Sequence, residues 1–186
     1  MTSPTAVQIP GYVPGTWTID PVHTHIGFMI KHMMVSKVRG HFRTFSGEIV
    51  TAEQPLDSSV NVTIEATSID TDNDMRDNHI RSADFFDAES HPNITFTSTQ
   101  IRSEDGEFFI DGDLTIRGTT RPVTLTVETP EFGPGAQGGT KAGFSATTVV
   151  NRHDFGVSYD GPIPGGGTVL GDKVQIVLDV EADLQT

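Results

Sequence analysis

Histidine is the residue type whose spacing in this chain comes closest to forming a chemical site. Of the seven histidines, His23 and His25 are two positions apart and would share one face of a strand, and His32 and His41 follow. Three converging imidazoles could hold zinc. The chain lacks the His-Glu-x-x-His and Glu-x-x-His patterns of helical metal sites, so histidines that cap or hydrogen-bond strand ends are the favoured alternative. We predict no metal and no other cofactor.

Nucleophilic catalysis finds little support in the sequence. There is no cysteine, which excludes a thiol nucleophile, a disulfide framework and cysteine-ligated metals, and no Gly-x-Ser-x-Gly elbow. Asp20, His23 and Asp154 could supply a carboxylate–imidazole pair, but nothing beside them is a nucleophile. The glycine run at 165–167 lacks the Lys-Ser/Thr of a phosphate-binding loop. We predict that the protein is not an enzyme, and keep catalysis on a bound lipid as the weakest alternative.

The charge and the chain ends narrow the class of protein further. The chain has 12 Lys and Arg against 25 Asp and Glu, a net charge of −13, which argues against a nucleic-acid partner. The first 15 residues contain neither a basic region nor an apolar one, and no apolar run approaches the roughly 18 residues of a membrane span. From this we expect a cytoplasmic protein.

Alternation of apolar and polar residues dominates the chain and predicts antiparallel strands, each with one apolar face. Eight such runs are expected at 16–32, 40–50, 59–69, 94–102, 107–116, 121–129, 141–151 and 172–183. One segment breaks the period and predicts an amphipathic helix after the potential cap Asp72, with apolar positions at Met75, Ile80, Ala83 and Phe86. Eight strands joined by short turns make a sandwich or a closed barrel, with the helix at one end.

The inward faces of these strands are rich in phenylalanine, of which the chain has 11. An eight-stranded barrel can be filled by its own side chains or can hold one small ligand, and the sequence period does not separate these two cases. The positions that we predict to face the interior are Trp17, Ile26, Phe28, Ile30, Phe42, Phe45, Val62, Ile64, Ile80, Phe85, Phe86, Ile94, Phe96, Leu114, Ile116, Phe144, Phe155, Ile176 and Leu178.

Several sequence blocks together resemble the YceI-like, polyisoprenoid-binding family. They occur in the order of that family and cover roughly residues 16 to 183. The blocks are Trp17-Thr-Ile-Asp20-Pro-Val-His23, Val38-Arg-Gly40-His-Phe42, Arg76-Asp77-Asn-His79-Ile80, Asp84-Phe85-Phe86-Asp87, His91-Pro92-Asn-Ile94, Gly112-Asp113-Leu114 and Asn151-Arg152-His-Asp154-Phe155-Gly156.

The resemblance implies an all-β, lipocalin-like barrel of eight antiparallel strands with one flanking helix, whose apolar lumen binds a polyisoprenoid. It divides the chain into an N-terminal extension (1–15) and one YceI-like domain (16–186). It also implies transport or storage of an isoprenoid quinone or polyprenyl lipid. Many family members carry a secretory signal. The polar start of this chain instead favours a ligand handled from the cytoplasmic side, with transient membrane contact.

Three arginines are candidates for binding an anionic head group at the mouth of the barrel: Arg76, Arg81 and Arg152. The alternative for each of them is an ordinary surface ion pair. A homodimer is compatible with barrels of this type, although no residue pattern demonstrates one. The alternative function is a filled barrel that acts as an interaction or stress-response module without a physiological ligand.

Overall fold

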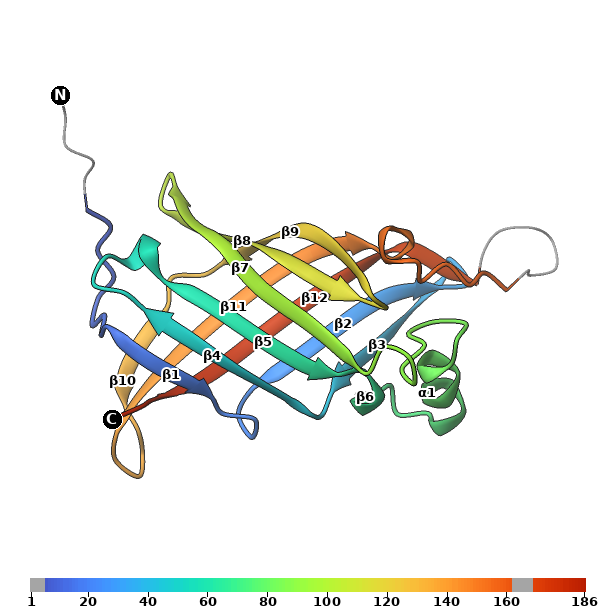
Figure 1. Ribbon diagram of the computed structural model, residues 1–186, viewed down its shortest axis with the longest axis horizontal. Coiled ribbons are helices and arrows are strands. Elements are labelled where there is room, and N and C mark those ends of the chain that lie inside the picture. Colours follow the sequence, from blue (N-terminus) through green and yellow to red (C-terminus); the bar gives the residue numbers. More distant parts are fainter. Residues whose placement is uncertain (1–5, 162–168) are drawn as a thin grey trace.

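The computed structural model describes residues 6–161 and 169–186, and in them the chain forms a closed antiparallel β-barrel (Figure 1). The Gly-rich run at 165–167 lies outside the described residues. The elements are β1 (Gly15–Ile19), β2 (His25–His32), β3 (Ser36–Phe42), β4 (Phe45–Thr51), η1 (Pro55–Asp57), β5 (Ser59–Glu65), η2 (Ala66–Ser68), β6 (Ile69–Asp70), α1 (Asp74–Arg81), β7 (Asn93–Glu104), β8 (Glu107–Ile116), β9 (Thr119–Val127), β10 (Glu131–Pro134), β11 (Thr140–Asn151), η3 (Arg152–Phe155) and β12 (Leu170–Leu184).

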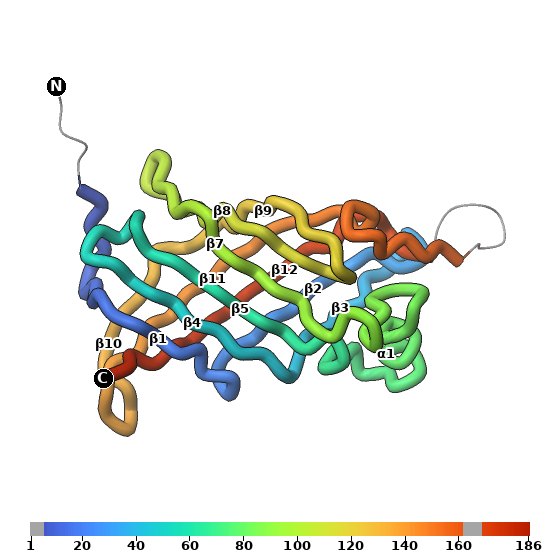
Figure 2. Tube along the Cα trace, in the orientation of Figure 1, coloured from blue at the N-terminus to red at the C-terminus, as the bar shows by residue number. Residues whose placement is uncertain are grey.

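These segments make eight long strands around the barrel, which confirms the predicted fold class. β1 and β2 both pair with β12, at its C-terminal and N-terminal parts respectively, so together they act as one long strand. In the same way, β3 and β4 together form one long strand, and β5 and β6 form another. β7, β8, β9 and β11 follow, and pairing of β11 with β12 closes the ring. The tube in Figure 2 shows these strands crossing the barrel axis obliquely.

Three predicted strands are corrected by this arrangement. The run 59–69 is interrupted by η2 between β5 and β6. The run 16–32 is interrupted at residues 20–24, where the chain leaves the sheet between β1 and β2. The run 40–50 begins earlier, at Ser36, and is interrupted between β3 and β4. These last two interruptions fall at the same level of the barrel, because β1 pairs with β4 and β2 with β3. Apolar and polar residues alternate strictly on both sides of each interruption, which explains why the sequence pattern predicts a single strand there.

The helix α1 lies at one end of the barrel and begins at a different cap from the one predicted. The side chain of Asn73, rather than Asp72, accepts a hydrogen bond from the backbone N–H of Arg76 at 2.9 Å. Met75, predicted to face the barrel, is 83% exposed, whereas Ile80 packs against the core. Two polar contacts fix the helix instead, because buried Asp77 accepts hydrogen bonds from the backbone and hydroxyl of Thr71. In the described residues, no helix is long and apolar enough to cross a membrane.

Candidate ligand-binding cavity

An apolar cavity of about 460 Å³ occupies the interior of the barrel. That volume falls within the range of small-molecule sites, roughly 300–1,000 Å³. Every predicted interior position except Trp17 and Phe45 contributes to its wall. On β12 the wall extends from Leu170 to Val180, ten residues further along the chain. At about 3.3 Å per residue and a strand tilt of about 40°, this is roughly 25 Å along the barrel axis. The cavity therefore suits an elongated apolar molecule.

Trp17 lies outside the cavity wall, although it is on the inward face of its strand, as predicted. Its side chain is fully buried, and Nε1 donates a hydrogen bond to the hydroxyl of Thr51 at 2.8 Å. Its ring packs edge-on against Phe132, with centroids 5.5 Å apart. Trp17 thus belongs to a small second core at the end of the barrel away from α1. Phe45, the other predicted position outside the wall, packs against both that core and the larger one.

Two glycines inside strands give phenylalanine rings room to lie against the barrel wall. A Cβ at Gly40 would lie 2.5 Å from Cζ of Phe28, which is its cross-strand partner. A Cβ at Gly112 would lie 2.4 Å from Cζ of Phe96. Because these glycines carry no side chain, both rings cover the backbone of a neighbouring strand. The rings therefore line the lumen without filling it.

The mouth of the cavity near α1 is polar and aromatic. Arg76 borders it and donates from Nε and Nη2 to the hydroxyl and carbonyl of Thr71, at 2.7 and 2.6 Å. His79 and Tyr159 also border it, and their rings meet edge-on with centroids 5.0 Å apart. His79 contacts the ring of Phe85 in the same way. This mouth therefore places hydrogen-bonding groups beside the apolar wall.

The other two predicted arginines have structural contacts. Arg152 is buried and borders the cavity, but its guanidinium donates to the carbonyls of Val157, Tyr159 and Gly171 and to the carboxylate of Asp160. It fixes the loop after η3 in this way. Arg81 lies outside the cavity wall and donates to the carbonyls of Thr67 and Ile69 and to the side chain of Asn78, which ties α1 to the barrel. Of the three, Arg76 is the one that both borders the cavity and is exposed to solvent.

Sequence reasoning missed the residues at the opposite end of the cavity. Ile9 and Tyr12, which precede the first strand, contribute to the wall there. The hydroxyl of Tyr12 donates to the carbonyl of Ala52 at 2.6 Å, and its ring packs on Phe132. The predicted N-terminal extension therefore packs on the barrel from residue 9 onward. An aromatic residue between Pro10 and Pro14 was the available signal for this packing.

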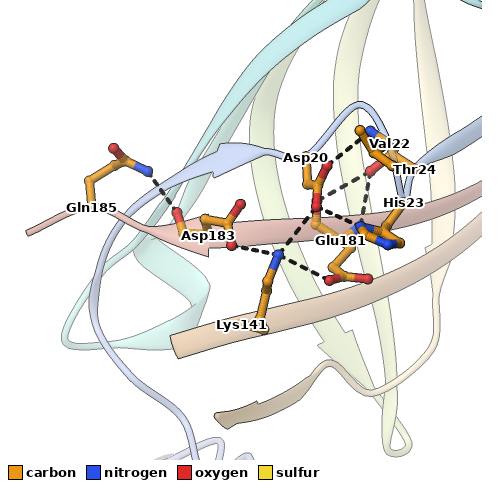
Figure 3. A network of polar contacts seen from close by, with 8 residues as sticks. All are labelled: Asp20, Val22, His23, Thr24, Lys141, Glu181, Asp183 and Gln185. Atoms are coloured by element: carbon orange, nitrogen blue, oxygen red, sulfur yellow. Dashed lines mark hydrogen bonds and ion pairs between the residues drawn. The ribbon is translucent and has the colours of Figure 1, made fainter. Parts of the chain in front are cut away.

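A polar network holds the break between β1 and β2 against β12 (Figure 3). Nδ1 of His23 lies 2.8 Å from a carboxylate oxygen of Asp20, and Nζ of Lys141 lies 3.2 Å from that same oxygen. Lys141 also contacts the carboxylates of Glu181 and Asp183 at 3.1 and 2.7 Å. The hydrogen bond from His23 holds the pKa of Asp20 well below its usual range, and the same bond raises the pKa of His23.

This network bears on both chemical alternatives raised by the histidines. Within the described part of the chain, one group of side chains, Asp20, His23 and Glu181, could share a metal ion, and Lys141 already contacts both of its carboxylates. His25 stacks near His41 instead of joining His23, and the ring centroids of that pair are 5.6 Å apart. Asp20 and His23 do form the expected carboxylate–imidazole pair, whose third partner is an ammonium group and not a nucleophile.

The fold and the cavity define a class of protein: an eight-stranded antiparallel barrel with an apolar lumen of ligand size. The family model of the YceI-like domain matches residues 17–182. The chain belongs to the YceI-like family.

Similar proteins agree with that assignment. The chain is 41% identical to a UPF0312 protein of Photorhabdus laumondii over 87% of this chain and 78% of that protein. It is 38% identical to Protein YceI of Escherichia coli, over 86% and 81% of the two chains. The crystal structure of Burkholderia cenocepacia BcnA matches with a TM-score of 0.74 and 26% identity, over 88% and 98%. A polyisoprenoid binding domain from Saccharophagus degradans shares the fold, with a TM-score of 0.64 and 12% identity, over 91% and 98%.

Proposed function

We propose that this protein binds a polyisoprenoid, such as an isoprenoid quinone or polyprenyl lipid, in the lumen of its barrel and carries or stores it. The observation that supports the proposal most directly is the long apolar cavity, whose wall is aliphatic and phenylalanine side chains for most of its length. A filled barrel, the alternative function, would have no such cavity. The polyisoprenoid-binding domain with the same fold is consistent with this ligand class.

The hydrophobic effect supplies the affinity. Each isoprene unit removes about five carbons from water, which is worth roughly 3–4 kcal/mol at ~0.8 kcal/mol per carbon. Several units would exceed the affinities that proteins reach, so the cost of ordering a flexible chain offsets much of this gain. Cavity length therefore selects for the number of units, and cavity width selects for the branched isoprenoid chain.

The head group of the ligand lies at the mouth near α1 in this proposal. Arg76, His79 and Tyr159 border that mouth and can donate hydrogen bonds to a quinone carbonyl or a phosphate. The opposite end carries the hydroxyls of Tyr12 and Thr51, which are already bonded to neighbouring carbonyls. Because the guanidinium of Arg76 borders the cavity only at the mouth near α1, an anionic head group would be attracted to that end.

Binding rather than catalysis is the activity that we infer. At the mouth, Arg76 donates to the hydroxyl and the carbonyl of Thr71, and Nε2 of His79 lies 2.7 Å from a carboxylate oxygen of Asp84. None of them forms a pair of nucleophile and base, which covalent catalysis on a lipid would need. We also infer a cytoplasmic site of action, which cell fractionation would test.

Organic extraction of the purified protein, followed by mass spectrometry, tests the proposed function. We expect an isoprenoid lipid in about one-to-one ratio with the protein, or uptake of a quinone at that ratio by delipidated protein. Arg76→Gln should weaken uptake of the quinone, whereas Arg81→Gln should leave it unchanged in folded protein. If no isoprenoid is extracted and none is taken up, the filled-barrel function replaces this proposal.

A further inference from the structure

We propose that the turn between β2 and β3 docks the protein on an anionic lipid bilayer. We call residues 31–39, which comprise that turn and its flanking strand ends, the hairpin tip. The proposal rests on the proposed function, because a carrier of a membrane lipid must meet the bilayer. The new claim is which part of the protein surface meets the bilayer and which lipid charge that surface recognises.

The turn displays apolar side chains to solvent. Met34 is 62% exposed and Val35 is 88% exposed, beside the partly exposed Met33. Met33 and Met34 both have left-handed backbones, with φ of 54° and 61°. Residues other than glycine and asparagine seldom adopt this conformation, and such outliers concentrate at functional sites. A turn selected for stability alone would have glycine or asparagine at these two positions.

The charge of the hairpin tip is opposite to that of the protein as a whole. Residues 21–47 contain none of the 25 acidic residues and four of the 12 lysines and arginines, in a chain of net charge −13. Lys31 and Lys37 are exposed and directly opposite each other across β2 and β3. Like charges in that position destabilise a sheet. Neither lysine belongs to an ion pair in the described residues, and anionic lipid head groups would compensate both charges.

The hairpin tip is joined to the mouth of the cavity. His32 and Val38, on either side of the turn, both line the cavity, and Met33 donates its backbone N–H to the carbonyl of Val169 at 2.8 Å. Figure 1 shows the end of β2 and the start of β3 at the same end of the barrel as α1. Insertion of the methionine and valine side chains among acyl chains, with the lysines at the head groups, brings the mouth to the bilayer surface.

Flotation with lipid vesicles tests this proposal on the full chain. We expect the wild type to bind vesicles that contain phosphatidylglycerol and not vesicles of phosphatidylcholine alone. Each lysine near an anionic surface contributes roughly a fivefold gain in affinity, so Lys31→Gln with Lys37→Gln should weaken binding about 25-fold. Met34→Ser with Val35→Ser should also weaken it. Val149→Ser is the control for the apolar change because Val149 is 59% exposed on β11, outside the hairpin tip.

The outcomes separate docking from lumen binding. Quinone uptake by every variant is measured without vesicles, and the hairpin-tip variants should take up as much as the wild type. If the wild type takes up quinone but does not bind anionic vesicles, the docking proposal is wrong and the proposed function is unaffected. Vesicle binding that survives both double substitutions also overturns it. A dimer that dissociates when the hairpin tip is substituted, without vesicle binding, assigns the surface to a second copy of the chain instead.

Discussion

Replacing Ile64 by tryptophan tests directly whether the barrel is hollow. Ile64 lies near the C-terminal end of β5, opposite Phe45 on β4 and Ile94 on β7, and its side chain forms part of the cavity wall. The neighbouring residue Thr63 is exposed on the outer face of the same strand. Ile64→Trp therefore places an indole in the lumen, and Thr63→Trp places the same group in water as a matched control.

The two states of the lumen predict different energies for this substitution. In a filled core, forced rotamers and backbone shifts from an added indole cost about 1–3 kcal/mol. In an open cavity of about 460 Å³, the indole gains contacts and the free energy of unfolding stays unchanged or rises. The indole would exclude about one isoprene unit, which removes up to about 4 kcal/mol of ligand burial. At 1.4 kcal/mol per factor of ten, affinity falls by up to roughly 700-fold.

Denaturant unfolding and quinone titration measure these two effects on the same preparations. We expect Ile64→Trp to keep its stability and lose at least tenfold in affinity, more for longer isoprenoids, and Thr63→Trp to keep both. A destabilised Ile64→Trp without ligand would indicate a filled lumen at this level. A stable Ile64→Trp with full affinity for long chains would refute the assignment of Ile64 to the binding wall.

Three further predictions address the wall, the buried end and the strand break. Gly40→Ala should reduce quinone affinity, because its Cβ would push a phenylalanine ring into the lumen, whereas Gly133→Ala, whose Cβ meets no neighbouring atom, should leave the titration unchanged. Thr51→Val should lower the free energy of unfolding by about 1–3 kcal/mol in denaturant, because the buried indole N–H of the single tryptophan loses its acceptor; an unchanged midpoint would contradict that role. The hydrogen bond between Asp20 and His23 lowers the pKa of the carboxyl from 3.8 and raises that of the imidazole from 6.5. The lowered pKa of the carboxyl stabilises the fold at pH values above its unfolded pKa, and the raised pKa of the imidazole stabilises the fold at pH values below its unfolded pKa. The loss of Tm in His23→Gln should therefore be largest at about pH 5 and shrink as the pH rises through the raised pKa of the imidazole. A loss that grows toward alkaline pH in thermal melts would contradict the pairing.

The fold could be predicted because each long strand has one face toward the lumen and one toward water. That asymmetry imposes a period of two wherever the wall continues. The break at residues 20–24 could not be predicted, because its partners are distant in sequence. The hydroxyl of Thr24 bonds to the backbone of Glu181, 157 residues away, and Asp20 donates its backbone N–H to the same residue's carbonyl. A local pattern carries no information about such contacts.

Strand parity places most of the predicted interior positions on the cavity wall, although the wall also contains many residues that were not predicted. Trp17, one of the two predicted positions outside the wall, shows the limit of strand parity. Parity identifies the side of the wall on which a residue lies, but not whether the lumen is open at that level. The small side chains of Ala142 and Ala182 and the ring of Phe132 accommodate the indole of Trp17 and bury it completely. Openness depends on the sizes of side chains from strands that are distant in sequence.

The same reasoning explains how a chain rich in phenylalanine keeps an open barrel. A ring can lie against the wall where the residue beside it on the neighbouring strand is a glycine, because no Cβ occupies that space. The register of β2 and β3 places Phe28 opposite Gly40, and the ring of Phe96 covers Gly112 on β8. Neither pairing can be recognised until the register is known. Once it is known, the glycines and the rings together determine the width of the lumen, and so which hydrocarbon chains can enter it.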